Sequence, residues 1–204
     1  MHENTDVNQG KPEEFIPASL VKRTIAFGMD AILLFILLQL VALLIPNFYD
    51  ESSQKEFNRL VYEVSLLRND EQFDSANMAK FIQESKLSEQ TYGMLIGMLI
   101  TSLIIPISYF FAGESFFKGQ TLGKATFGLR TVLKDKFEHP SMGKILLRSV
   151  IKSFASISLI TPFMLPGFLN FCFCLFNRKK RCVHDFLSNT VTVQPADKEI
   201  KNNE

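Results

Sequence analysis

One carboxylate lies in a stretch of sequence where a carboxylate is costly. The stretch from Ile25 to Ile45 is 21 residues long, and its strongly polar members are Asp30 and Gln39. A charged group that faces lipid near a helix end loses several kcal/mol of hydration, so Asp30 should face protein or water and have a partner. Asp30 is therefore interpreted as part of a buried ion-pair network or, alternatively, as a titrating or ion-coordinating carboxylate.

Basic residues elsewhere in the chain are the expected partners of this carboxylate. Arg23 lies seven residues before Asp30, two turns away on the same helix face and about 10.5 Å along the axis. The two side chains should therefore meet partners on other elements. The candidate cations for Asp30 are Arg130, Arg148, Lys152 and the basic cluster that precedes Asp185.

A glycine-rich loop, Gly119-Gln120-Thr121-Leu122-Gly123-Lys124, resembles a phosphate-binding loop but lacks its spacing. A P-loop has four residues between its first glycine and Gly-Lys, followed by Ser or Thr, whereas this loop has three and is followed by Ala125. A tight turn is the favoured interpretation. The alternative is contact of Gly119, Gly123 and Lys124 with an anion or a lipid headgroup.

His184-Asp185 has the residue types of a catalytic pair but not its geometry. Adjacent residues cannot act as a base and the group that orients it, and no nucleophile in a recognisable setting accompanies them. We therefore expect no enzyme activity. Cys172, Cys174 and Cys182 are interpreted as buried reduced thiols, and with only His184 and Asp185 nearby we expect no metal and no cofactor.

Three apolar stretches must position these residues, and they predict an all-α, polytopic membrane helical bundle. Residues 25–45 reach about 30 Å as a helix, which is the thickness of the hydrocarbon core. Residues 92–112 form a second full span, with Ser88 as its cap, Pro106 as a kink and Gly113 as its end. Residues 153–176 contain prolines and predict a third element that is one broken span or a hairpin.

The segments between the spans carry local signals of their own. Ser53-x-x-Glu56 predicts the start of a helix within an extracytoplasmic insertion, residues 46–91. Ser141 predicts the cap of an amphipathic, basic helix at the membrane interface, with Arg148 and Lys152 near its middle. Residues 126–133 read as extended or turning. The β-prone run at residues 190–193 lies along the bilayer surface or closes against the cytoplasmic loop.

The distribution of charge predicts the orientation of the chain. Residues 46–91 carry five basic and nine acidic side chains, whereas residues 113–153 carry eight and three. The positive-inside rule places the N-terminus, residues 113–153 and the C-terminal tail in the cytoplasm. Residues 1–16 and 195–204 are expected to be disordered tails around a membrane domain, residues 17–194. A net charge of +1 argues against nucleic acid as a partner.

Four elements in order resemble those of the RDD family of bacterial integral membrane proteins, named for one arginine and two aspartates. They are Arg23-x-x-Ala26-x-x-x-Asp30, then Gly119 to Lys124 with Gly128-Leu129-Arg130, then Leu146-Leu147-Arg148, and finally Arg181-x-x-His184-Asp185-x-x-x-x-Thr190-Val191. The likeness covers about residues 17–45 and 92–194. Ser188-Asn189-Thr190 departs mildly from the family's usual ending, and residues 46–91 are longer than expected.

The resemblance implies a multi-pass protein of the bacterial plasma (inner) membrane. Some members of the family are described as sodium/proton antiporters. By that likeness Asp30 and Asp185 would exchange protons and monovalent cations, Arg23 would tune them, and a chain this small would work as a homo-oligomer in the lipid bilayer. The alternative is a non-catalytic membrane scaffold or accessory subunit, in which Arg23, Asp30, Asp185, Arg148 and Arg130 form a structural ion-pair network.

Overall fold

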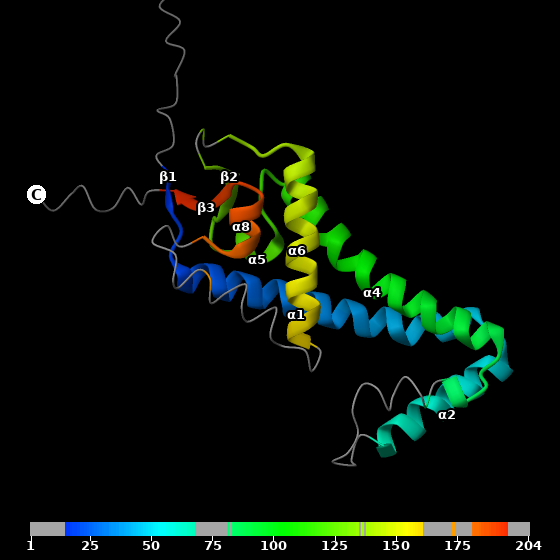
Figure 1. Ribbon diagram of the computed structural model, residues 1–204. Helices are drawn as coiled ribbons and strands as arrows, with labels where there is room; N and C mark the ends of the chain where they lie inside the picture. Colours follow the sequence, from blue (N-terminus) through cyan, green and yellow to red (C-terminus); the bar gives the residue numbers. More distant parts are fainter. Residues whose placement is uncertain are drawn as a thin grey trace, which may run out of the picture. The chain divides into compact units, whose positions relative to one another are not determined.

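The computed structural model describes residues 15–67, 81, 83–134, 136, 138–160, 173 and 181–195 (Figure 1). The chain is mostly helical, as predicted. By their internal contacts the residues form two compact units, Met1–Ala31 with Ile107–Glu204 (the first unit) and Ile32–Pro106 (the second unit). The elements are β1 (Phe15–Pro17), α1 (Leu20–Leu44), the short 3-10 helix η1 (Ile45–Phe48), α2 (Glu51–Leu67), α4 (Glu89–Phe116), α5 (Leu122–Ala125), β2 (Arg130–Leu133), α6 (Met142–Ile160), α8 (Val183–Leu187) and β3 (Thr190–Pro195).

Two helices of the described chain are long and apolar enough to cross a membrane. They are α1, which continues through η1 to give Leu20–Phe48, and α4, Glu89–Phe116. Both predicted full spans are thus helices of sufficient length and apolar character, and each extends three to five residues beyond the predicted bounds at either end. Residues 153–160 belong to α6. Of the rest of the third apolar stretch the structure describes Phe173 alone, so the broken or hairpin-like element stays a prediction.

The start of α4 was predicted correctly from the sequence, and its end was predicted wrongly. Ser88 caps the helix, because its Oγ accepts a hydrogen bond from the amide of Thr91 at 3.3 Å. Gly113 does not end it, since α4 continues to Phe116 and stops before two residues with positive φ, Lys118 (52°) and Gly119 (81°). Gly113 instead allows close packing: a Cβ there would lie 3.2 Å from the carbonyl oxygen of Gln120.

A three-stranded antiparallel sheet with the order β1-β3-β2 corrects the all-α prediction. Arg130 pairs with Val193 and Leu133 with Thr190, so the β-prone run closes against the segment that follows the glycine-rich loop. On the other edge of β3, Ile16 pairs with Gln194. In Figure 1 the three strands, α5 and α8 gather beside the first turns of α1.

Helix α6 buries two charged side chains and exposes several large apolar ones. Ser141 precedes its first turn as predicted, with the amide of Ile145 bonded to the Ser141 carbonyl at 3.1 Å. Arg148 and Lys152 are 1% and 2% exposed, whereas Leu147 and Phe154 are exposed. Buried carboxylates of the first unit bind these cations, and the place of the helix at the membrane interface stays a prediction.

In the second unit, helix α2 begins at Glu51 with Asp50 as its cap. The amide of Ser53 donates to Asp50 Oδ2 at 3.4 Å, and hydrogen bonds from Ser52 and Ser53 lower the pKa of Asp50 to about 2. The predicted capping box is wrong, although the predicted helix is present. The Glu56 carboxylate instead accepts hydrogen bonds from the Ser88 amide and hydroxyl and from the Thr91 hydroxyl, at the start of α4.

Candidate functional site

Two arginines from different helices bind the same carboxylate. Arg23 of α1 donates to Asp185 Oδ2, and Arg148 of α6 donates to Asp185 Oδ1. Asp185 is fully buried, and both arginines are buried as well. Burial alone would raise the pKa of Asp185, but the charges of Arg148 and Arg23 outweigh it and hold that pKa well below its usual range. As expected, Arg23 meets a partner on an element other than its own.

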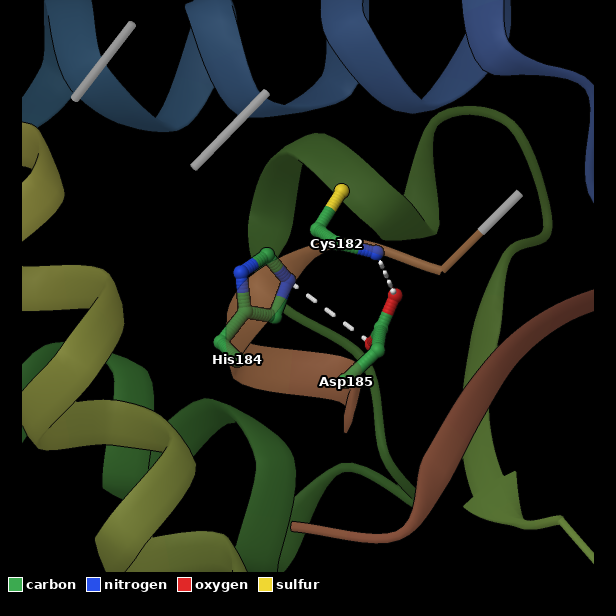
Figure 2. Close-up of side chains that lie close together, drawn as sticks. All are labelled: Cys182, His184 and Asp185. Carbon is green, nitrogen blue, oxygen red and sulfur yellow. Dashed lines mark hydrogen bonds and ion pairs between the residues drawn. The ribbon is translucent and has the colours of Figure 1, made fainter. Parts of the chain in front are cut away.

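Asp185 also closes the first turn of α8. It occupies the third helical position, and the amide of Cys182, the residue before the helix, donates to its Oδ2 at 3.3 Å (Figure 2). His184 Nε2 lies 3.7 Å from Asp185 Oδ1. Burial lowers the pKa of His184 well below its ordinary value, so the imidazole is neutral near pH 7. Asp185 thus joins two helices and at the same time caps a third.

Cys182, His184 and Asp185 have ligand atoms close enough to hold a metal ion, but their chemistry does not fit one (Figure 2). Cys182 is disulfide-bonded, so the prediction of a reduced thiol is wrong for this residue, and its sulfur is not a thiolate ligand. Each oxygen of Asp185 already accepts from an arginine. The chemistry of these three residues is therefore that of a structural contact at the start of α8 and not that of a metal centre.

Asp30 is buried, as predicted, but uncharged donors hold it. Its carboxylate accepts hydrogen bonds from the Tyr109 hydroxyl at 2.6 Å, the Thr121 hydroxyl at 2.6 Å and the Gly123 amide at 2.8 Å. Asp30 is only 1% exposed. No Lys or Arg in the described residues forms an ion pair with it; of the candidate cations Arg130, Arg148 and Lys152, Lys152 interacts with Asp30 through the longer-range attraction of the two charges.

The glycine-rich loop is the binding element for Asp30. Gly119 turns the chain with φ +81°, and Thr121 caps the short helix α5. Gly123 then packs directly on α1, where an added Cβ would lie 2.0 Å from the carbonyl oxygen of Ala26. Only glycine fits this approach. The loop is a tight turn, as favoured, and its amide binds an internal carboxylate in place of an external anion.

Glu114 is a third fully buried carboxylate, and three cations surround it. Lys124 Nζ lies 2.6 Å from Oε1, Lys152 Nζ 3.3 Å from Oε1, and Arg148 Nε 2.8 Å from Oε2. Lys124 also donates to the Thr131 hydroxyl at 2.5 Å and is 6% exposed, which corrects the prediction that it contacts a lipid headgroup. Burial lowers the pKa of Lys124 to about 7, although the charge of Glu114 opposes this shift.

Three residues that bind these buried charges, Glu114, Tyr109 and Thr121, were not predicted from the sequence. Glu114 follows Gly113, which was taken as the end of the span, although a lone acidic residue beyond 21 uncharged ones is itself a signal of burial. Tyr109 and Thr121 carry no distinguishing pattern, because single hydroxyls are common in such sequences. We call Arg23, Asp30, Glu114, Lys124, Arg148, Lys152 and Asp185 the buried charge cluster.

A cavity of about 30 Å³ lies within the cluster and is lined by Arg23, Asp30, Lys124, Arg148, Lys152 and His184, among others. Arg130 was predicted to belong with these residues. It lies on β2 and lines a different cavity, of about 450 Å³, with Lys118 and His139. The structure thus brings together Arg23, Asp185 and Arg148, holds Asp30 at the wall of the same cavity, and places Arg130 elsewhere.

The family model of the RDD family matches residues 17–189, which is most of the chain. The chain belongs to the RDD family. Comparisons with curated proteins and with solved structures find no match. In this RDD protein, the arginine at position 23 and the aspartate at position 185 form an ion pair between α1 and α8. The aspartate at position 30 has a separate binding loop. Membership of this family and the two apolar helices together indicate a membrane protein.

Proposed function

We propose that this RDD protein is a non-catalytic scaffold or accessory protein of the bacterial plasma membrane. The observation that carries the proposal is that the protein's own donors engage the three carboxylates that are buried among the described residues. Asp30 accepts three hydrogen bonds, Glu114 has three cations around it, and Asp185 binds two arginines and an amide. Contacts of this kind between elements fix the register of helices, which is the best attested use of buried polar groups.

The proposed orientation places the buried charge cluster at the cytoplasmic side. It follows from the basic excess of residues 113–153 and the four consecutive basic residues at 178–181, which are hard to translocate. Asn202→Cys, in a chain without its native cysteines, tests the orientation by labelling with a membrane-impermeant maleimide. Labelling should require permeabilised cells, and labelling of intact cells would overturn the cytoplasmic placement of the tail.

The scaffold proposal predicts a loss of assembly when the cluster is broken. Arg23→Gln should lower the amount of the protein in the membrane and the recovery of proteins crosslinked to it in cells. Lys22→Gln is the matched control, because it removes the same charge at the neighbouring position, where the side chain is only half-buried. An Arg23→Gln protein that keeps both the wild-type amount and the wild-type crosslinked set would count against the scaffold.

One observation favours cation/proton exchange as a second candidate. Asp30 is the carboxylate of the cluster that is held by uncharged donors, and it lines the cavity. A carboxylate in that setting can take up a proton or a monovalent cation without first breaking an ion pair. A chain with so few spans would exchange ions as a homo-oligomer.

Reconstituted liposomes separate the two candidates. Purified protein is incorporated with a pH-sensitive dye inside, and sodium or potassium is added outside. The scaffold proposal expects no cation-dependent proton movement above that of protein-free liposomes. Movement that Asp30→Asn abolishes would overturn it in favour of exchange, provided that the Asp30→Asn protein keeps the helical content and elution volume of the wild type.

A further inference from the structure

The buried charge cluster contains more positive than negative charge. Among the described residues, four buried Lys and Arg side chains surround three buried carboxylates. The cations are Arg23, Lys124, Arg148 and Lys152, and the anions are Asp30, Glu114 and Asp185. His184 adds no charge because its pKa is lowered by burial. Residues 161–180, which connect α6 to Arg181, contain no Asp or Glu.

Arg181 is a further buried cation, and it has no carboxylate partner among the contacts described. Arg181 donates to the main-chain carbonyl groups of Thr190 at 3.1 Å and Asp185 at 2.8 Å. Carbonyl groups satisfy its N–H donors without cancelling its charge. An uncompensated charge in a protein interior is strongly destabilising, so a cluster of this kind requires a counter-ion or the loss of a proton.

The cavity beside these cations has the size for a single small ion. Its volume is about 30 Å³, and the four cations all contribute to its wall. About 10–15 Å³ is enough for one water molecule, so the space admits a monatomic ion and excludes phosphate, sulfate or a carboxylate ligand. Phe27 and Leu129 add apolar surface to the wall, which also includes one carboxylate, Asp30, whose oxygens already accept hydrogen bonds from Tyr109, Thr121 and Gly123. The excess of positive charge favours an anion over a cation.

We propose that this cavity binds one halide ion, chloride under physiological conditions, which neutralises the excess positive charge of Arg23, Lys124, Arg148 and Lys152. The bound ion completes the electrostatic balance of the first unit. It is a structural ion, bound to the folded state and released on unfolding. The inference is independent of the scaffold proposal, since it concerns the stability of the cluster and not what the protein assembles with.

The test compares chloride with gluconate, which is too large for the cavity. The full chain in detergent at pH 6, where Lys124 is charged, is titrated from sodium gluconate into sodium chloride at constant ionic strength. The melting temperature is read by calorimetry, because the chain contains no Trp. An ion bound only by the folded state should raise Tm in a saturable way, by roughly 5 °C at a concentration of about 100 times its Kd.

Substitutions on α6 make the test specific to the cavity. Lys152→Met removes one buried positive charge and should abolish the chloride-dependent rise in Tm. Lys144→Met, on the same helix but not lining the cavity, should keep the full rise. Equal dependence on chloride in the wild type and in Lys152→Met would overturn the proposal.

A direct measurement keeps the proposal testable if Lys152→Met does not fold. Equilibrium dialysis of the wild-type protein with radioactive chloride should show one ion bound per chain, displaced by bromide and not by gluconate. Absence of bound chloride at concentrations at which chloride should saturate the site, together with equal Tm in the two salts, would overturn the halide site.

Discussion

The two parts of helix α1 belong to different units, and they are stabilised in different ways. In the first unit, Arg23, Ala26 and Asp30 of α1 are buried against other elements of the same unit. In the second unit, Ile36, Leu40 and Leu43 of the same helix are more than half exposed. One part of the helix is therefore fixed by polar contacts of defined geometry, and the other presents apolar surface suited to lipid.

This difference shows where the specificity of the fold lies. Lipid contacts are non-directional, so they fix neither the rotation of a helix nor its register. Ion pairs and hydrogen bonds are directional, and in the first unit they join α1, α4, α6 and α8 through Asp185 and Glu114. The comparison predicts that single polar substitutions are severe in the first unit and mild in the second.

The largest effect is expected for Asp185→Asn. The substitution leaves Arg23 and Arg148 without their shared carboxylate in a buried site, which should cost about 3–5 kcal/mol of unfolding free energy. Unfolding of the purified protein by SDS in mixed micelles measures it. Glu63→Gln in α2, which breaks a surface ion pair with Arg59, is the control and should leave the stability unchanged. Equal losses of stability for Asp185→Asn and Glu63→Gln would contradict the claim that polar contacts stabilise the first unit more than the second.

A smaller but still large effect is expected for Gly123→Ala. The new methyl group would lie 2.0 Å from the Ala26 carbonyl oxygen and 2.9 Å from Asp30 Oδ1, so α5 must move away from α1 at a cost of about 1–3 kcal/mol. Gly93→Ala is the matched control in α4, because nothing lies within 4 Å of its added Cβ. It should stabilise the protein by roughly 0.5–1 kcal/mol. Destabilisation by Gly93→Ala would contradict the comparison.

Much of this architecture could be predicted from the sequence, because apolar length and charge placement are strong signals. The two spans, the burial of Asp30 and the separate partners of Arg23 and Asp30 all follow from the cost of charge in lipid. For the β-prone run at residues 190–193 the sequence left two placements open, and the structure shows the one against the segment around Arg130. The sheet itself was missed in the all-α prediction because its strands are short.

The wrong predictions share a physical cause. The direction of a side chain depends on partners far away in the sequence, and neighbouring residues do not reveal those partners. Lys152 is a candidate partner of Asp30 by sequence, yet its hydrogen bond goes to another carboxylate, 38 positions earlier in the chain. A contact of Lys124 with a lipid headgroup is expected only as long as its internal partner, Glu114, is placed beyond the end of α4. Hydroxyl donors such as Tyr109 give no sequence signal at all, so the uncharged binding of Asp30 required the structure.

The pH dependence of stability offers a third way to compare the units. The unfolded chain protonates His184 near pH 6.5, whereas the folded chain resists protonation, so stability should fall as the pH drops below about 6.5. Below about pH 3.8 Asp185 adds a further loss, because its pKa is lower in the folded than in the unfolded state. In the second unit Asp50, whose pKa is about 2, contributes only in that lower range.

His184→Gln isolates the contribution of the first unit to this profile. The variant should lose the slope of Tm between about pH 6.5 and 4.5 and keep the steeper loss at lower pH. Lys124, with a pKa of about 7, stays protonated in both states over most of this range and does not interfere. A wild-type Tm that is constant from pH 7 to 4.5 would contradict the neutral, buried imidazole.

The smallest effect is expected for Thr91→Val in the second unit. Thr91 is buried, and its hydroxyl donates to Glu56 Oε2 at 2.5 Å, but the Ser88 amide and hydroxyl bind the same oxygen. Valine keeps the shape and removes one of three donors, so Tm should fall slightly, by less than for either large-effect substitution above. Thr101→Val is the control, because its hydroxyl donates only to the Gly97 carbonyl of its own helix. A loss for Thr91→Val as large as that for Asp185→Asn would mean that polar contacts hold the second unit as tightly as the first, and that lipid contact is not what distinguishes them.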